Sequence, residues 1–378
     1  MKTKTVFDLT IDFEKSHGSY VFNKNTQTDF LDFFSMFSSL PLGYNHRIFD
    51  DSFTKKISAI SKIRMANNFF QTDELVEFRD KFRKYVFSDY IHFNCTGALA
   101  VESALKCALE YKKVDNPMVI GLKKGFHGIN SWGFVTDRYL GTAERIKHFP
   151  RNQWQNLSLD EIKSAIENQD IHNLVAVIVE PIQCTAGDIY IDPADLLALQ
   201  RLCNQHDICF IVDEIQTGFG VTGKMWYSEK IGLEPDILVF GKKSQISGIV
   251  VKEKYNECIV SPIRKLEVTF DGELMDAVRA MYILKAYEED DLLNKANAHS
   301  ERFRRILERK VLNYRSTGHL VAFDFENGKE RDAFVKACYE KRFLCNPTAE
   351  KTVRMRPNMA VSPDEIDHFE ELMNSILK

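Results

Sequence analysis

Residues 174–180 read LVAVIVE, residues 208–213 read ICFIVD and residues 236–242 read DILVFGK. Each stretch is a short, continuous apolar run that has a charged residue at its end. Continuous runs rich in β-branched residues are typical of strands that are covered on both faces, as in a parallel sheet. Between the first two runs, residues 192–203 read DPADLLALQRLC, which predicts an amphipathic helix with a polar start. The order strand, helix, strand therefore predicts an α/β fold with a mostly parallel sheet.

Three charged residues terminate these runs: Glu180, Asp213 and Lys242. In parallel α/β sheets, ligands bind outside the carboxyl ends of the strands, so the residues that end the strands are the first candidates for chemistry. A single charged residue in this position usually marks only the return of the chain to water. Two acids and a lysine at three such ends favour a functional site.

A second candidate site lies in residues 92–111, HFNCTGALAVESALKCALEY. The pattern predicts a strand end, a tight turn at Thr96, Gly97 and Ala98, and a long helix. The first backbone N–H groups of a helix lack acceptors and lie at the positive end of its dipole, where a phosphate binds well. The same turn also serves as an ordinary helix cap, so both interpretations stay open.

Residues 123–132, KKGFHGINSW, place Phe126 and His127 between two glycines in what we expect to be a loop. Glycines permit close backbone approach, and an exposed aromatic pair suits stacking on a planar ligand. Packing of the two rings into the local core is an equally good interpretation.

Composition narrows the class of protein. The chain has 378 residues, with 50 Lys and Arg against 54 Asp and Glu and a net charge of −4, which argues against a nucleic-acid partner. The N-terminal MKTKTVFDLTIDFEK has no apolar signal region, and no run approaches the roughly 18 apolar residues of a membrane span. Eight cysteines without a CxxC pair and histidines without an HExxH motif indicate reduced thiols and no metal site. We therefore expect a soluble, cytoplasmic protein.

Taken together, the motifs resemble the fold-type I, class III pyridoxal phosphate-dependent aminotransferases over nearly the whole chain. The blocks that carry the resemblance are residues 211–224 (IVDEIQTGFGVTGK), 234–243 (EPDILVFGKK), 125–128 (GFHG), 179–183 (VEPIQ) and 353–357 (VRMRP). Residues 96–102 (TGALAVE) and 240–245 (FGKKSQ) are most similar to the L-lysine 6-aminotransferase branch.

We expect a large domain of residues 46–265 that carries a mixed, mostly parallel sheet between helices and binds the cofactor. The two termini, residues 1–45 and 266–378, are expected to build a smaller α/β domain. In that part, residues 317–325 alternate like an antiparallel strand, and residues 363–377 predict an amphipathic closing helix.

The resemblance implies pyridoxal 5'-phosphate as the cofactor, with Lys242 as the catalytic residue. Lys242 would hold the cofactor aldehyde as a Schiff base and then transfer the proton, which requires a lowered pKa. Its neighbour Lys243 stays open as an alternative, although the family spacing favours Lys242. Asp213 would keep the pyridine nitrogen protonated, so that the ring accepts electrons.

The remaining cofactor contacts follow from the same resemblance. It implies that Ile215 and Phe126 enclose the ring, and that Gln216 reaches its phenolic oxygen. His127 belongs to the same cofactor-binding set. The resemblance further implies that Gly97 and Ala98 donate backbone N–H groups to the phosphate. A threonine from the partner subunit completes this phosphate site in the family, and the matching residue is Thr269, which implies a homodimer with shared active sites.

Two substrate-recognition positions depart from the family pattern. Thr185 occupies the position of a glutamate that pairs with an arginine in many members, while that arginine is present as Arg354. Arg354 is therefore expected to bind a substrate carboxylate constitutively. Ile129 replaces the arginine that holds the substrate carboxylate in the lysine branch, and an apolar side chain cannot substitute for it. Other basic residues, such as Arg356, are candidates for that role.

We therefore expect an aminotransferase that moves an amino group from a terminal amine to a 2-oxo acid such as 2-oxoglutarate by ping-pong chemistry. The donor is lysine-like, a related diamine or an ω-amino acid. Two alternatives stay open. One is another pyridoxal phosphate enzyme on the same fold, either an aminomutase or a decarboxylating aminotransferase. The other is a non-catalytic scaffold that kept the fold.

Overall fold

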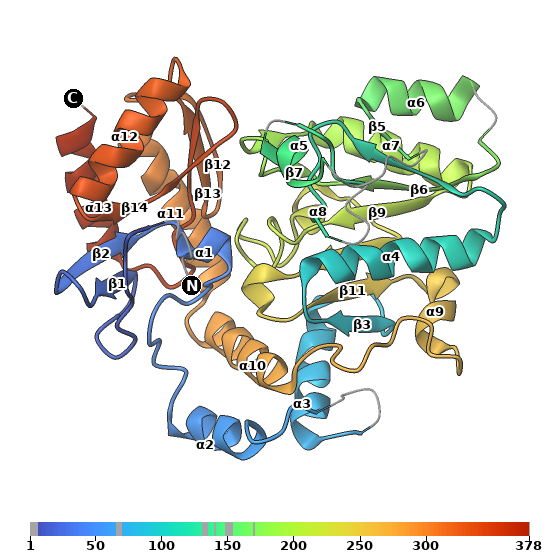
Figure 1. The fold of residues 1–378 in the computed structure, drawn as a ribbon, viewed down its shortest axis with the longest axis horizontal. Helices are drawn as coiled ribbons and strands as arrows, with labels where there is room; N and C mark the ends of the chain where they lie inside the picture. The colour runs from blue at the N-terminus through green and yellow to red at the C-terminus, as the bar shows by residue number, and fades with distance from the viewer. Residues whose placement is uncertain are drawn as a thin grey trace.

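A seven-stranded sheet occupies the right half of Figure 1. The computed structural model describes residues 7–65, 70–130, 135–139, 141–147, 154–168 and 171–377. In sheet order the strands are β3 (Ile91–Asn94), β11 (Ser247–Val251), β10 (Ile237–Phe240), β9 (Cys209–Asp213), β6 (Leu174–Val179), β4 (Met118–Leu122) and β5 (Gln155–Leu157). Strand β11 is antiparallel to both of its neighbours, while the other neighbouring pairs are parallel. The predicted mixed, mostly parallel sheet is confirmed.

Both faces of this sheet are covered, which explains the continuous apolar runs. On β9, Cys209 and Ile211 pack in the cluster that contains helix α4 (Gly97–Lys112). Phe210 and Val212 point to the opposite face and pack with helices α6 (Leu159–Asn168) and α7 (Pro193–Gln205). Because alternate side chains enter two different cores, the strand has no polar face. Helix α7 begins where it was expected, since Asp192 caps it by accepting a hydrogen bond from Ala194 N.

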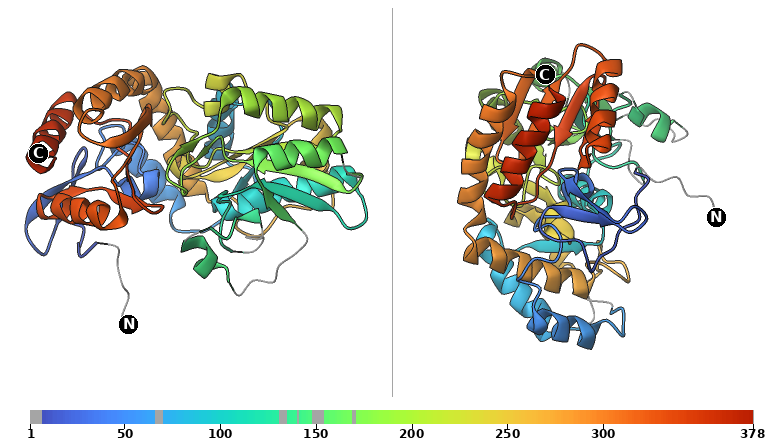
Figure 2. Two further views of the ribbon diagram at one scale, coloured as in Figure 1. Left: turned by 90° about the horizontal axis from the view of Figure 1, so that it is seen from above. Right: turned by 90° about the vertical axis from the view of Figure 1, so that its left-hand side faces the viewer.

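The two ends of the chain come together in the left half of Figure 1. Strands β1 (Tyr20–Asn23) and β2 (Thr28–Asp32) form a sheet with β14 (Phe343–Leu344), and β2 pairs directly with β14. Both views in Figure 2 place these blue N-terminal strands beside the red C-terminal helices. The C-terminal helices are α11 (Leu292–Leu307), α12 (Gly328–Glu340) and α13 (Pro363–Ile376). The N-terminal segment thus joins the C-terminal part, whereas the domain boundaries at residues 45/46 and 265/266 stay a prediction.

A four-stranded antiparallel sheet completes this half. Its order is β12 (Leu312–Thr317), β13 (Leu320–Asp324), β16 (Thr352–Met355) and β15 (Asn346–Thr348). The single strand expected over residues 317–325 is wrong in its extent, because the chain reverses at Gly318, whose φ is +56°. The apparent alternation across residues 317–325 spans this hairpin turn.

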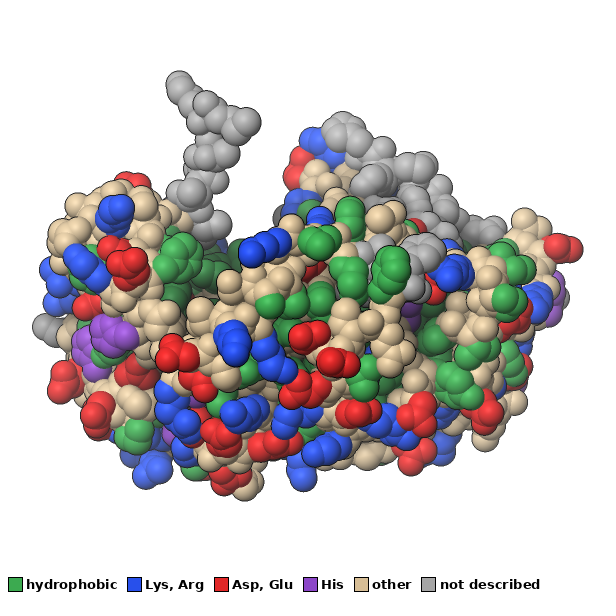
Figure 3. Space-filling view, turned by 90° about the horizontal axis from the view of Figure 1, so that it is seen from below, with side chains coloured by type: hydrophobic (Ala, Val, Ile, Leu, Met, Phe, Trp, Pro, Cys, Tyr) green, Lys and Arg blue, Asp and Glu red, His purple; other side chains and the backbone are tan. Residues whose placement is uncertain are grey.

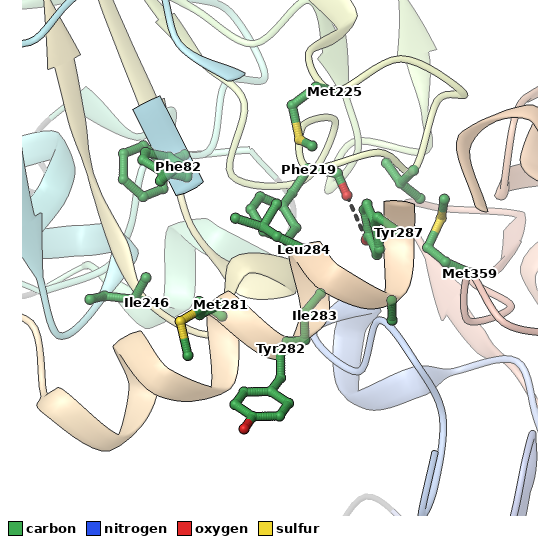
Figure 4. Packing of buried hydrophobic residues seen from close by; sticks show 14 of the residues in the cluster. Phe82, Phe219, Met225, Ile246, Met281, Tyr282, Ile283, Leu284, Tyr287 and Met359 are labelled. Atoms are coloured by element: carbon green, nitrogen blue, oxygen red, sulfur yellow. Dashed lines mark hydrogen bonds between the residues drawn. The ribbon is translucent and has the colours of Figure 1, made fainter. Parts of the chain in front are cut away.

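Helix α10 (Leu274–Glu289) connects the two halves through a buried core. Figure 4 shows Leu284 and Tyr287 of α10 packed near Phe219, with Met359 of the C-terminal part on the other side of Tyr287. The Tyr287 hydroxyl donates a 2.9 Å hydrogen bond to the Phe219 carbonyl oxygen. Helix α3 (Asp73–Phe82) packs in the same core. The other short elements are α1 (Ser35–Ser38), α2 (Asp51–Ile60), α5 (Gly141–Arg145), α8 (Tyr227–Ile231), α9 (Glu257–Val260), β7 (Ile182–Gln183) and β8 (Ile189–Tyr190).

The surface carries both signs of charge. Acidic and basic side chains are interspersed over the face in Figure 3, as the net charge of −4 leads one to expect. Within the described ranges, every helix is too short or too polar to cross a membrane.

Candidate active site

A cavity of about 210 Å³ lies where β6, β9 and β10 end. Its walls bring together residues from five separate stretches of the chain: Gly97, Ala98, Phe126, His127, Gly128, Glu180, Asp213, Ile215, Gln216 and Lys242. Every residue proposed from the sequence for cofactor binding or catalysis lies here, except Thr269. Arg354, proposed for the substrate, also lies outside this lining. The expectation that ligands bind outside the carboxyl ends of the strands thus led to a cavity in the structure.

A buried hydrogen-bond network fixes Asp213 at the end of β9. His127 Nδ1 lies 2.8 Å from Asp213 Oδ2, and Ile215 N donates to Oδ1 at 3.0 Å. His127 is held in turn, because its backbone N–H donates to Thr136 Oγ1 at 2.7 Å. The carboxylate is therefore oriented by groups on both of its oxygens.

Glu180 is a member of the site to which the sequence assigned no role. Its Oε1 accepts a 2.8 Å hydrogen bond from Phe126 N, which ties the Phe126 loop to the end of β6. Burial raises the pKa of Glu180 to about 7; the nearby His127 opposes this rise and Asp213 adds to it. The sequence did indicate Glu180 as a candidate, because it is one of the three charged residues that follow the predicted strands.

The two neighbouring lysines have different surroundings. Lys242 lines the cavity in a left-handed conformation, with φ of +55°. Burial and, second, the positive charge of Arg354 lower the pKa of Lys242 to about 8. Lys243 is buried elsewhere, where its Nζ donates to the Gln216 carbonyl oxygen at 2.7 Å and to Ser38 Oγ at 3.4 Å. The geometry favours Lys242 as the reactive amine.

The start of α4 fits both interpretations of the Thr96 turn. Thr96 Oγ1 accepts a 3.4 Å hydrogen bond from Leu99 N, so it does cap the helix. Gly97 and Ala98 follow and line the cavity with first-turn N–H groups, which have no acceptor inside a helix. A Cβ atom at position 97 would lie 2.7 Å from Ile215 Cδ1, so glycine keeps this wall open.

Arg354, on β16, does not line the cavity, and it contacts the residue that precedes Thr185. Its Nη1 donates to the Cys184 carbonyl oxygen at 3.0 Å, and burial lowers its pKa to about 10. Thr185 Oγ1 accepts a 3.4 Å hydrogen bond from Gln216 Nε2. Arg356 is unsuited to the role considered for it, because it is buried and its Nη2 donates to Asp188 Oδ1 at 2.5 Å.

The residues of the cavity fit pyridoxal phosphate. They offer an amine of lowered pKa, a fixed carboxylate, a helix N-terminus and the apolar side chains of Phe126 and Ile215. In addition, His127 Nε2 is buried without a hydrogen-bond partner in the described part of the chain. Thr269 is exposed in the loop before α10 and does not line this cavity.

Comparison with known proteins agrees with this assignment. A family model described as aminotransferase class-III matches residues 2–377. The L-lysine-epsilon aminotransferase of Amycolatopsis lactamdurans is 28% identical, and the alignment covers 98% of this chain and 92% of the relative. The lysine aminotransferase from Mycobacterium tuberculosis in its internal aldimine form superposes with a TM-score of 0.92 at 27% identity, over 99% of this chain and 96% of that one. The ornithine aminotransferase from Toxoplasma gondii shares the fold, with a TM-score of 0.88 at 22% identity over 100% of this chain and 92% of that one.

Proposed function

The chain belongs to the class-III aminotransferase family, and we propose that it moves an amino group from a terminal amine to a 2-oxo acid such as 2-oxoglutarate. It is a pyridoxal phosphate-dependent transaminase. The observation that carries the proposal is the single cavity that joins Lys242, Asp213 and the start of α4. The donor we propose is lysine-like, a related diamine or an ω-amino acid, on the strength of the lysine aminotransferases among the relatives.

The cofactor supplies an electron sink when it is bound, and the residues of the cavity would hold and tune it. Lys242 is proposed to bind its aldehyde, and Asp213 to pair with its ring nitrogen. Phe126 and Ile215 would enclose the ring from two sides. The N–H groups of Gly97 and Ala98 would donate to the phosphate, where the helix dipole favours negative charge.

Proton transfer is the task of Lys242 in this proposal. Because its pKa is lowered to about 8, about a tenth of the amine is neutral at pH 7 and about half at pH 8, and the neutral form can accept a proton. His127 keeps Asp213 oriented, and Gln216 is proposed to contact the phenolic oxygen, although its amide also bonds Thr185. Glu180 holds the backbone of Phe126 in place.

Arg354 is proposed to bind a substrate carboxylate. It has no acidic side chain as a hydrogen-bond partner in the described part of the chain, since its contacts are the Cys184 carbonyl oxygen and Asn346 Oδ1. A guanidinium without a carboxylate partner is free to form a bidentate pair with one. The presence of Thr185 in place of a competing glutamate supports this role.

A homodimer that shares its active sites is part of the proposal. Thr269 of the partner subunit would complete the phosphate site, which agrees with the exposed position of Thr269 in the described chain. Four apolar side chains of residues 260–270, the stretch that contains Thr269, are exposed: Val260 by 58%, Ile263 by 78%, Val268 by 52% and Phe270 by 38%. Such surfaces commonly mark protein interfaces. We also propose a cytoplasmic location, with which the free thiols of all eight cysteines agree.

Single-turnover spectroscopy tests the proposed activity. The holoenzyme is mixed with L-lysine, a diamine or 4-aminobutyrate without an acceptor, and the absorbance band of the bound cofactor is followed. We expect at least one amine to shift the band and 2-oxoglutarate to reverse the shift. The Lys242→Ala variant is the control that should not turn over. A wild-type band that responds to no primary amine would contradict the proposal.

A further inference from the structure

We propose that Arg145, assisted by Lys124, forms a second carboxylate-binding subsite. It would take over the role of the arginine that Ile129 replaces. The inference rests on the proposed transaminase function and names the class of substrate: an acceptor or donor with two carboxylates, or with one carboxylate far from the reacting carbon. The subsite is a separate cavity of about 250 Å³, lined by Lys124, Phe126, Tyr139, Thr142, Arg145, Thr185, Ala186, Thr348 and Ala349.

The two cavities are neighbours. Phe126 lines both of them. Thr185 lines the outer cavity and accepts a hydrogen bond from Gln216, which lines the inner one. In this proposal, a substrate that reacts at Lys242 and extends past Phe126 and Thr185 reaches the outer cavity.

Neither cation of the outer cavity forms an ion pair through its side chain with a described carboxylate, although the backbone N–H of Lys124 donates to Asp137 Oδ2 and Glu350 lies near Tyr139. Arg145 places its guanidinium carbon 5.6 Å from the centre of the Phe126 ring, and Lys124 places Nζ 5.1 Å from the centre of the Tyr139 ring. No carboxylate in the described ranges forms an ion pair with either. Their sequence neighbours differ, since Lys123 pairs with Glu161 and Lys147 pairs with Glu144. Of these four cations, the two that line the cavity are the two that form no ion pair with a described carboxylate.

Arg145 is also positioned by its helix. Thr142 Oγ1, at the start of α5, lies 2.6 Å from both the Asp137 and the Tyr139 carbonyl oxygens and donates its one proton to either of them, and Ile146, which follows α5, is buried. The guanidinium of Arg145 lies near the Phe126 ring, and a guanidinium is a planar, bidentate donor that matches a carboxylate. Thr185, whose hydroxyl accepts from Gln216, still has its own proton to donate.

Arg354 and Arg145 together describe a two-point site. Arg354 donates to the Cys184 carbonyl oxygen, directly before Thr185 and Ala186 of the outer cavity, and it is proposed to hold the carboxylate next to the reacting carbon. Arg145 would hold the distant one. With Arg145 in this role, the half-buried Ile129 does not abolish carboxylate binding. The positive charge is then supplied from α5 and not from the residue after Gly128.

The test measures binding of glutarate and of glutaramate, in which one carboxylate is an amide, to the holoenzyme by calorimetry. Arg145→Met keeps the aliphatic stem over Phe126 and removes the charge. We expect it to weaken glutarate binding by about 10- to 100-fold and to leave glutaramate within about twofold. Lys147→Met, which removes a charge from the same end of α5, is the matched control and should change neither. Arg145→Lys should restore part of the affinity.

Equal glutarate affinity in Arg145→Met and Lys147→Met would overturn the subsite, and so would an equal loss for glutarate and glutaramate. Binding of these unreactive acids needs no turnover. A failed amine response therefore counts against the proposed activity, whereas a failed glutarate discrimination counts against Arg145. In an active enzyme, Arg145→Met should also lower kcat/KM for 2-oxoglutarate more than for 2-oxopentanoate.

Discussion

His127 Nδ1 lies 2.8 Å from Asp213 Oδ2 at the end of β9, and both side chains are buried. The second carboxylate oxygen accepts from Ile215 N at 3.0 Å. A carboxylate held on both oxygens cannot rotate away from the cavity that it lines. The pair thus presents a negative charge in one direction, which is what the protonated nitrogen of the proposed cofactor requires.

Replacing Asp213 by Asn tests this relationship. The amide keeps an oxygen for Ile215 N and offers an N–H group to His127, so the fold should persist while the negative charge is lost. We expect kcat to fall by about 100- to 1000-fold, in the range seen when a preorganised charge or dipole is removed from an active site. Thermal unfolding with bound cofactor serves as the control for folding. A kcat within about tenfold of the wild type would contradict the assigned role.

The choice between Lys242 and Lys243 can be settled chemically. Borohydride reduction of the holoenzyme, followed by peptide mass spectrometry, should find the cofactor on Lys242, because Lys243 is occupied with the Gln216 carbonyl oxygen and Ser38. Lys242→Ala should lose the adduct and the activity. Lys243→Met should keep the adduct, and an adduct on Lys243 in the wild type would reverse the assignment.

The sequence located the strands of the site well because strand burial is a local pattern. The run at residues 174–179 is β6 to the residue, and the runs at 208–213 and 236–242 contain β9 and β10. Because alternate side chains of these strands pack in cores on opposite faces of the sheet, the sequence of each strand is a continuous apolar run. The residues that end the strands then followed directly.

The outer cavity could not be predicted in this way. Arg145 and Lys124 are 21 positions apart in the chain, and Thr348 comes from the other end of it. No periodicity links such residues, because only the tertiary fold brings their loops together. Similarly, sequence reasoning considered Arg356 as a carboxylate ligand, but burial against Asp188 excludes it. The direction in which a side chain points depends on contacts that are distant in sequence.

The pH dependence of cofactor uptake follows from the surroundings of Lys242. Only the neutral amine attacks an aldehyde, so recombination of the apo-protein with pyridoxal phosphate should slow about tenfold per pH unit below the pKa of about 8 and level off above it. Arg354 lowers this pKa through its positive charge. Arg354→Met should therefore raise the pKa and move the inflection to higher pH.

The exposed Arg201 of α7 provides the matched control. Arg201→Met removes the same charge from a helix that contributes no residue to the cavity lining, and it should leave the inflection where it is. An inflection that stays in place or moves to lower pH in Arg354→Met would show that Arg354 does not act on Lys242 in this way.

The shared active site predicts complementation between two defective chains. Thr269→Val removes the hydroxyl that the partner subunit is proposed to give to the phosphate, and it should weaken cofactor binding by about 2- to 12-fold, the value of one neutral hydrogen bond. Lys242→Ala is inactive by itself. In a heterodimer of the two variants, one site combines Lys242 of one chain with Thr269 of the other and is intact, while the second site carries both defects.

Mixing the two variants should therefore restore tight cofactor binding and activity at one site in each heterodimer. The restored activity should follow the dimer fraction measured by sedimentation on dilution, because a monomer lacks the partner's hydroxyl. Mixing Thr269→Val with wild type gives the reference for subunit exchange. If Thr269 acted within its own chain, the heterodimer would contain no intact site, since each chain carries one defect. Absence of complementation despite proven exchange, or full activity in a proven monomer, would place the complete site within a single chain.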